Sequence, residues 1–141
     1  MKIIFFDIDG TLICGGSERM SESTKEAIRI ARANGHICMI NTGRTKRLVG
    51  GNLTGQVEFD GLLLGCGTEI EYHGKQLMHK TFSMEESKAI LTAMKKYHVD
   101  AVLEGSREDY APRGEEVFTE TFRHMAREIE NRKYDRYANA P

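Results

Sequence analysis

The first half of the chain alternates short apolar runs with a segment of helical periodicity. The apolar runs cover residues 3–7, 37–40 and 62–64, and each one stops at acidic, polar or glycine residues. After the first run, apolar residues recur at helical spacing beyond Ser21, a candidate N-cap, and stop at an Asn-Gly pair, residues 34–35. Strands that alternate with helices predict an α/β fold, a Rossmann-like parallel sheet whose first two strands are buried on both faces.

Glycines and a change of periodicity mark the remaining elements. A short helix is expected after Arg44, and Gly50-Gly51 should break it. The pattern after residue 68 is typical of an α+β arrangement rather than of a longer parallel sheet. The expected elements there are a hairpin of residues 69–73 and 75–80, a helix over 84–97, two short strands at 100–104 and 109–111, and a helix over 115–136.

Composition narrows the class of protein. The chain has 141 residues, 40% of them hydrophobic, and a formal net charge of −1, as expected of a globular domain with a real core. The balanced charge argues against a nucleic-acid partner or an anionic membrane surface, and no apolar run approaches the ~18 residues of a membrane span. Cys14, Cys38 and Cys66 are widely spaced, which favours reduced thiols in a cytoplasmic protein over disulfides or a zinc site.

The strongest candidate chemistry follows the first apolar run, in the sequence Asp7-Ile8-Asp9-Gly10-Thr11. Residues two apart along a strand point to one side, and open α/β sheets bind ligands at the carboxyl ends of their strands. Gly10 allows a sharp turn, so the N–H groups of Gly10 and Thr11 can point at an anion. A carboxylate can attack phosphorus, a second acid can exchange protons, and two carboxylates facing a phosphate require a divalent cation such as Mg²⁺.

This run of residues resembles the first motif of the haloacid dehalogenase superfamily, a strand that leads into D-x-D-G-T-[LV]. The resemblance implies that Asp7 is the nucleophile and that Asp9 is the general acid and base. It also implies that Mg²⁺ binds to the Asp7 side chain and the Asp9 backbone carbonyl. The implied function is a phosphatase acting on a small phosphorylated metabolite, with a sugar phosphate as the candidate substrate, through an aspartyl-phosphate intermediate.

A second motif follows the second predicted strand, in Asn41-Thr42-Gly43-Arg44. A hydroxyl group and the N–H groups that open a helix can hold phosphoryl oxygens, which makes Thr42 and Gly43 candidate phosphate ligands. The alternative for Thr42 is an ordinary helix N-cap. Thr-Gly-Arg resembles the form typical of the Cof-like branch of the superfamily, whose members insert an α+β cap after the third strand.

The resemblance implies a core and a cap, both incomplete. Residues 1–80 correspond to the N-terminal part of the core and residues 81–141 to a partial cap. Two later family motifs, a Lys and an acidic pair, have no counterpart, so we expect an N-terminal fragment with weak Mg²⁺ binding and near-background turnover. Its first strand would lie at an open edge of the sheet, which predicts that the isolated chain self-associates.

Three alternatives can be compared with this interpretation. In a complete capless enzyme, residues 101–104 would form a fourth core strand, Glu104 or Asp109 would bind the metal, and Lys80 or Lys88 would neutralise charge. A pseudoenzyme would keep the fold for binding or assembly alone. A receiver domain would carry its phosphorylated Asp at the end of the third strand, but this chain has Gly65 there, so this alternative is discounted.

Overall fold

The chain divides into two compact units in the computed structural model, which describes residues 1–14, 17–105, 109–110, 117–124 and 127. The first unit is built on residues 1–81, and the second begins at Phe82. All of the candidate site residues lie in the first unit.

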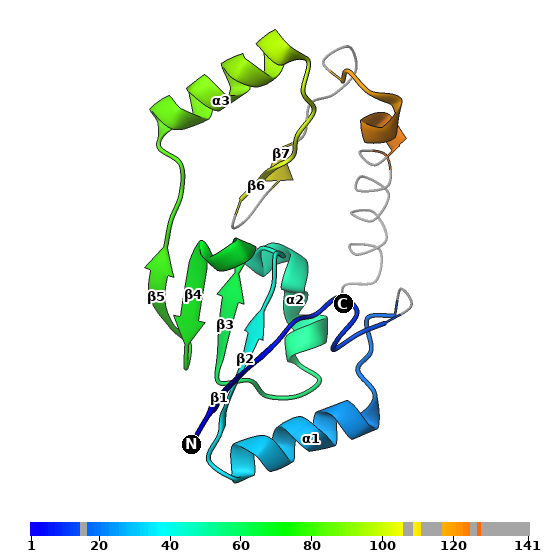
Figure 1. Ribbon diagram of the computed structural model, residues 1–141, viewed down its shortest axis with the longest axis vertical. Coiled ribbons are helices and arrows are strands. Elements are labelled where there is room, and N and C mark those ends of the chain that lie inside the picture. Colours follow the sequence, from blue (N-terminus) through cyan, green and yellow to red (C-terminus); the bar gives the residue numbers. More distant parts are fainter. Residues whose placement is uncertain (15–16, 106–108, 111–116, 125–126, 128–141) are drawn as a thin grey trace, which may run out of the picture. The chain divides into compact units, whose positions relative to one another are not determined.

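The first unit contains a five-stranded sheet (Figure 1). Its strands, in spatial order, are β1 (Ile3–Phe6), β2 (Ile37–Asn41), β3 (Gly61–Leu64), β4 (Glu69–Tyr72) and β5 (Lys75–His79). Strands β1, β2 and β3 are parallel, whereas β4 and β5 form a hairpin that extends the sheet in antiparallel fashion. The predicted α/β class is confirmed, and β1 lies at the edge of the sheet.

Two helices connect the parallel strands. Helix α1 (Glu22–Ala33) begins as predicted, because the Ser21 hydroxyl accepts a hydrogen bond from the Thr24 N–H at 3.1 Å. Helix α2 (Lys46–Thr54) is interrupted at the glycine pair, where a break was expected. Gly50 has a φ of 62° and a ψ of 161°, outside the helical region, so two short helical segments meet at a kink there and the predicted break is confirmed.

The hydrophobic core lies on one face of the sheet, because side chains alternate along each strand. The register aligns the inward residues of β1, β2 and β3, and both helices pack against them. The core residues of the strands are Ile4, Phe6, Cys38, Ile40, Leu62 and Leu64, and those of the helices are Ile28, Ala31, Val49 and Leu53.

The opposite face of β1 is open. Ile3 and Phe5 are 53% and 51% exposed, because the register turns them away from the face that α1 and α2 cover. The expectation that this strand is buried on both faces is therefore wrong for β1. The same face of β2 is better protected, since Met39 is buried.

Gly61 fixes the approach of the hairpin to the parallel strands. A Cβ atom at this position would lie 2.4 Å from the Glu71 carbonyl oxygen and 2.6 Å from the Met39 methyl carbon. Backbone and side chain close on it from two sides, so β3 and β4 can pair here only around a glycine.

The second unit begins with α3 (Met84–Tyr97), which a capping box of Ser83 and Glu86 starts. Strands β6 (Leu103–Glu104) and β7 (Asp109–Tyr110) form a separate two-stranded sheet. Because β6 belongs to that sheet, it does not form the fourth core strand that the capless alternative requires. Most of the helix predicted over 115–136 lies outside the described residues.

Candidate active site at the carboxyl edge of the sheet

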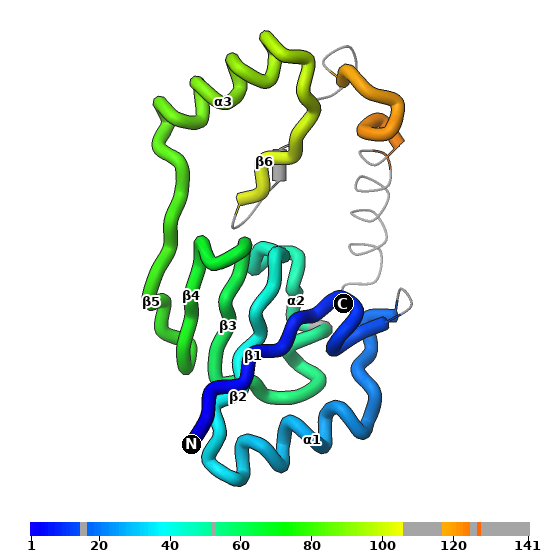
Figure 2. Tube along the Cα trace, in the orientation of Figure 1, coloured from blue at the N-terminus to red at the C-terminus, as the bar shows by residue number. Residues whose placement is uncertain are grey.

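Three loops meet at the edge of the sheet where the parallel strands end, and they form the candidate site (Figures 1 and 2). Asp7 and Asp9 follow β1, Thr42 follows β2, and Gly65 follows β3. The parallel register of these neighbouring strands brings their carboxyl ends to one edge of the sheet. This is the edge at which open α/β sheets bind ligands.

The loop after β1 is folded tightly on itself. The Leu12 N–H donates to the Asp7 carbonyl at 3.2 Å, and the Gly10 N–H donates to the Ile13 carbonyl at 2.8 Å. Gly10 has a φ of +80°, which a glycine adopts without strain. The Thr11 N–H donates to the Ile8 carbonyl at 3.3 Å, so the N–H groups of Gly10 and Thr11 both serve the turn. Their binding of phosphate stays a prediction.

The two candidate carboxylates have different surroundings. The guanidinium group of Arg44 donates to both carboxylate oxygens of Asp9: Nε lies 2.9 Å from Oδ2, and Nη2 lies 2.5 Å from Oδ1. The Asp7 side chain is exposed, and within the described part of the chain no hydrogen bond or ion pair engages it. Asp7 is therefore the carboxylate that remains open to an incoming group.

Thr42 is buried at the end of β2. Its N–H donates to the Leu63 carbonyl at 3.0 Å, and its hydroxyl oxygen accepts from the Arg44 N–H at 3.2 Å. The N-cap of α2 is Thr45, so Thr42 is not the ordinary helix N-cap that the sequence left open. Its role as a phosphate ligand stays a prediction.

The loop after β3 is tied to the loop after β2. The Gly65 N–H donates to the Arg44 carbonyl at 3.0 Å, and the Cys66 N–H donates to the Thr42 carbonyl at 3.2 Å. The Cys66 sulfur would lie 3.4 Å from a Cβ atom at Gly43, so the two loops are also in van der Waals proximity there. Together with the ion pair between Arg44 and Asp9, these contacts connect the loops after β1, β2 and β3 at this edge of the sheet.

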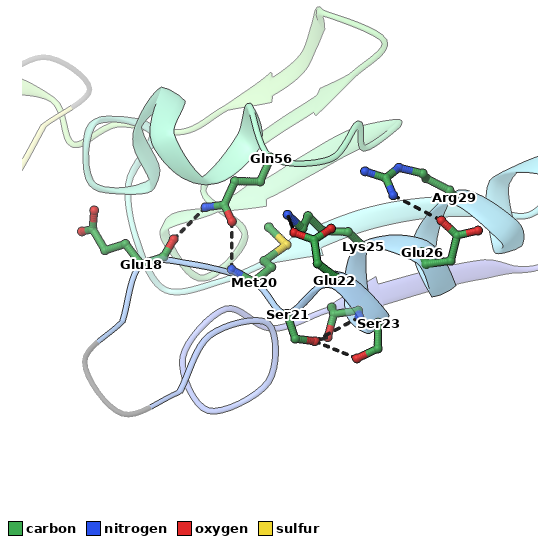
Figure 3. A network of polar contacts seen from close by, with 10 residues as sticks. Glu18, Met20, Ser21, Glu22, Ser23, Lys25, Glu26, Arg29 and Gln56 are labelled. Carbon is green, nitrogen blue, oxygen red and sulfur yellow. Dashed lines mark hydrogen bonds and ion pairs between the residues drawn. The ribbon is translucent and has the colours of Figure 1, made fainter.

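Sequence reasoning assigned no role to Arg44 or Gln56, and both organise the loop after β1. The Gln56 side chain accepts from the Met20 N–H at 2.8 Å and donates to the Glu18 carbonyl at 2.7 Å (Figure 3). It anchors the approach to α1 against the residues that follow α2. Arg44 could have been found from its place, because a cation at the end of β2 adjoins the acids at the end of β1.

A second arginine–aspartate pair lies at the amino end of the same strands. Asp60 is buried just before β3, and its Oδ1 accepts from Arg32 Nε at 3.1 Å and Nη2 at 2.9 Å. Its Oδ2 accepts from the Cys38 N–H at 2.8 Å. Burial raises the pKa of Asp60, but Arg32 and the Cys38 N–H outweigh it, so the pKa lies below its ordinary value.

The donors at the carboxyl edge suit a hard cation. The Asp7 carboxylate and the Asp9 backbone carbonyl both offer oxygen donors, and among the described backbone hydrogen bonds none uses that carbonyl. Within the described residues, no three acidic, histidine or cysteine side chains gather into a metal cluster. Two oxygen donors fit Mg²⁺, which keeps several waters when it binds to proteins.

A family comparison identifies the fold. The family model of the haloacid dehalogenase-like hydrolases matches residues 4–140, nearly the whole chain. The chain belongs to the haloacid dehalogenase-like hydrolases. The resemblance seen at Asp7 and Asp9 is thereby confirmed at the level of the family.

Solved structures of the superfamily share this fold. A phosphatase of the superfamily from Bacteroides thetaiotaomicron is 21% identical with a TM-score of 0.77, over 92% of this chain and 47% of that one. A haloacid dehalogenase-like hydrolase from B. subtilis is 24% identical with a TM-score of 0.65, over 81% and 40%. A sugar phosphatase of subclass IIB is 29% identical with a TM-score of 0.65, over 77% and 43%. The chain therefore spans less than half the length of these proteins.

None of the curated proteins matches this chain. No helix among the described residues has the length and apolar character that a membrane crossing needs.

Proposed function

We propose that the whole protein is a Mg²⁺-dependent phosphatase of a small phosphorylated metabolite, and that a sugar phosphate is the substrate class. Membership of the hydrolase family supports the reaction class. The sugar phosphatase that is 29% identical supports the substrate class. The observation that carries the proposal is the asymmetry of the two acids, since Asp9 is held by Arg44 whereas the Asp7 carboxylate is open.

The two acids would divide the chemistry between them. An Asp7 carboxylate oxygen attacks phosphorus, and the bond between phosphorus and the ester oxygen breaks. Asp9, as the acid, gives its proton to the departing oxygen. In the second half, Asp9 as the base takes a proton from water while the water oxygen attacks phosphorus, and the acyl-phosphate bond to Asp7 breaks. Inorganic phosphate leaves, and both carboxyl groups return to their starting state.

The Asp7 carboxylate and the Asp9 carbonyl would hold Mg²⁺, which supplies charge neutralisation to the phosphoryl oxygens when bound. Thr42 and Gly43 would bind those oxygens from the loop after β2. Gly10 and Thr11 complete the proposed phosphate site from the loop after β1. Because Asp9 would bind the metal through its backbone, its side chain remains available for proton exchange.

Replacement of Asp7 by Asn tests the covalent mechanism in the whole protein. Asn cannot form the acyl phosphate, so Mg²⁺-dependent release of phosphate from a panel of sugar phosphates should fall by at least about a thousandfold. Asp60→Asn is a matched control, since it removes a carboxylate outside the site. Unchanged turnover in Asp7→Asn would exclude Asp7 as the nucleophile, and an inactive wild-type protein on the panel would overturn the substrate class.

A further inference from the structure

Arg44 is the residue through which the three loops of the site are joined. Its backbone N–H donates to the Thr42 hydroxyl at 3.2 Å, and its carbonyl accepts from the Gly65 N–H at 3.0 Å. Its guanidinium group crosses to the loop after β1 and binds to both oxygens of Asp9. A residue fixed at its backbone and paired at its side chain can set the position of its partner.

The ion pair contributes little to stability by itself. The Asp9 side chain is 62% exposed, and exposed ion pairs stabilise proteins only weakly. Two parallel hydrogen bonds to one carboxylate do, however, fix its rotation and its plane. No other side chain within the described residues forms a hydrogen bond or ion pair with Asp9. The consequence of the pair is therefore orientation.

We propose that Arg44 is a positioning residue that holds the Asp9 carboxyl group in the orientation for proton exchange. This inference rests on the proposed function, in which Asp9 is the acid and base. Arginine stays protonated and cannot take over the proton transfer itself. A carboxyl group that must meet first an ester oxygen and then a water needs a fixed location, and a misplacement of ~1 Å can cost about a hundredfold in rate.

The alternative is that Arg44 leaves Asp9 and binds to the substrate phosphate. The two roles differ in their kinetics. Loss of a positioning group lowers kcat with little change in KM, whereas loss of a substrate ligand raises KM. Lysine separates the roles again, because it keeps the charge but cannot make the two-point contact with a carboxylate.

The experiment measures steady-state kinetics of Arg44→Ala and Arg44→Lys in the whole protein. We expect Arg44→Ala to lower kcat about tenfold to a hundredfold with KM within about twofold, and Arg44→Lys to recover only part of the loss. Guanidinium ion at low millimolar concentration should raise the kcat of Arg44→Ala several-fold, because it can occupy the vacated place beside Asp9. It should not rescue Asp9→Asn.

Arg29→Gln is the matched control, since Arg29 also pairs with a carboxylate, Glu26 at 3.2 Å, but lies on α1 (Figure 3). It should leave kcat and KM unchanged. A kcat of Arg44→Ala and Arg44→Lys within twofold of wild type would overturn the inference, as would a rise in KM alone. If Arg44→Ala does not fold, the kcat of Arg44→Lys decides. A wild-type protein without phosphatase activity would instead refute the proposed function.

Discussion

The two ends of the sheet each carry an arginine–aspartate pair, and the two pairs have opposite environments. At the amino end, Asp60 is 10% exposed in its side chain and binds to both Arg32 and the Cys38 N–H. At the carboxyl end, Asp9 is 62% exposed in its side chain and binds to Arg44. The same two chemical groups therefore meet once in the interior and once in solvent.

The difference separates a structural pair from a functional one. Removal of one partner of a buried pair leaves an unsatisfied charge and an unpaired N–H group, which destabilises the fold. Removal of one partner of an exposed pair leaves groups that water can solvate. A substitution at the amino end should therefore change stability, whereas a substitution at the carboxyl end should change turnover.

Of the two paired aspartates, Asp9 should show the larger effect. In the whole protein, Asp9→Asn should lower kcat by about 10²–10⁴-fold, because the amide cannot exchange the proton. Its Tm should stay within about 2 °C of wild type, since the lost pair is exposed. Mg²⁺ binding, followed by calorimetry, should persist because the backbone carbonyl is unchanged. A lowered Tm with normal kcat would contradict this prediction, because it would show that the Asp9 pair is structural rather than functional.

The next effect is expected at Asp60. Asp60→Ala should lower the free energy of unfolding by about 2–4 kcal/mol, because Arg32 and the Cys38 N–H lose their buried acceptor. Chemical denaturation checks the loss. Asp60→Asn should cost less, since its amide oxygen still accepts a hydrogen bond. The folded fraction of both variants should keep the wild-type kcat, and a reduced kcat would mean that the two ends of the sheet are coupled.

The smallest effect concerns pH. The pKa of Asp60 is lowered in the fold from its ordinary value of 3.8, so its contribution to stability is fully present above that value. The contribution is lost as the pH falls through the folded pKa. The difference in unfolding free energy between wild type and Asp60→Asn should be constant between about pH 7 and 5 and should shrink below about pH 4. A difference that grows on acidification would contradict this sign.

The strands and the order of the loops could be predicted from the sequence because both depend on local patterns. The apolar runs predict β1, β2 and β3, and the polar residues that follow them lie at one edge of a parallel sheet. Ser21 acts as a cap for the same local reason, since its side chain satisfies an N–H three residues away.

Long-range contacts could not be predicted in the same way. The place of Arg44 near the acids follows from the order of the strands, but its pairing with Asp9 depends on the directions of two side chains 35 positions apart. The exposure of Ile3 and Phe5 depends on which face of the sheet the helices cover. A run of apolar residues does not indicate which face that is.

The close approach at Gly61 has a consequence for sequence variation. Every single-nucleotide missense change in a glycine codon introduces a residue with a Cβ atom, and at Gly61 that atom would meet a backbone oxygen at 2.4 Å. No single substitution of Gly61 avoids this clash, because even the Cβ atom of Ala would meet the same backbone oxygen. Among natural homologues that pair β3 and β4 as closely, lineages should retain glycine here even where they exchange their catalytic specificity.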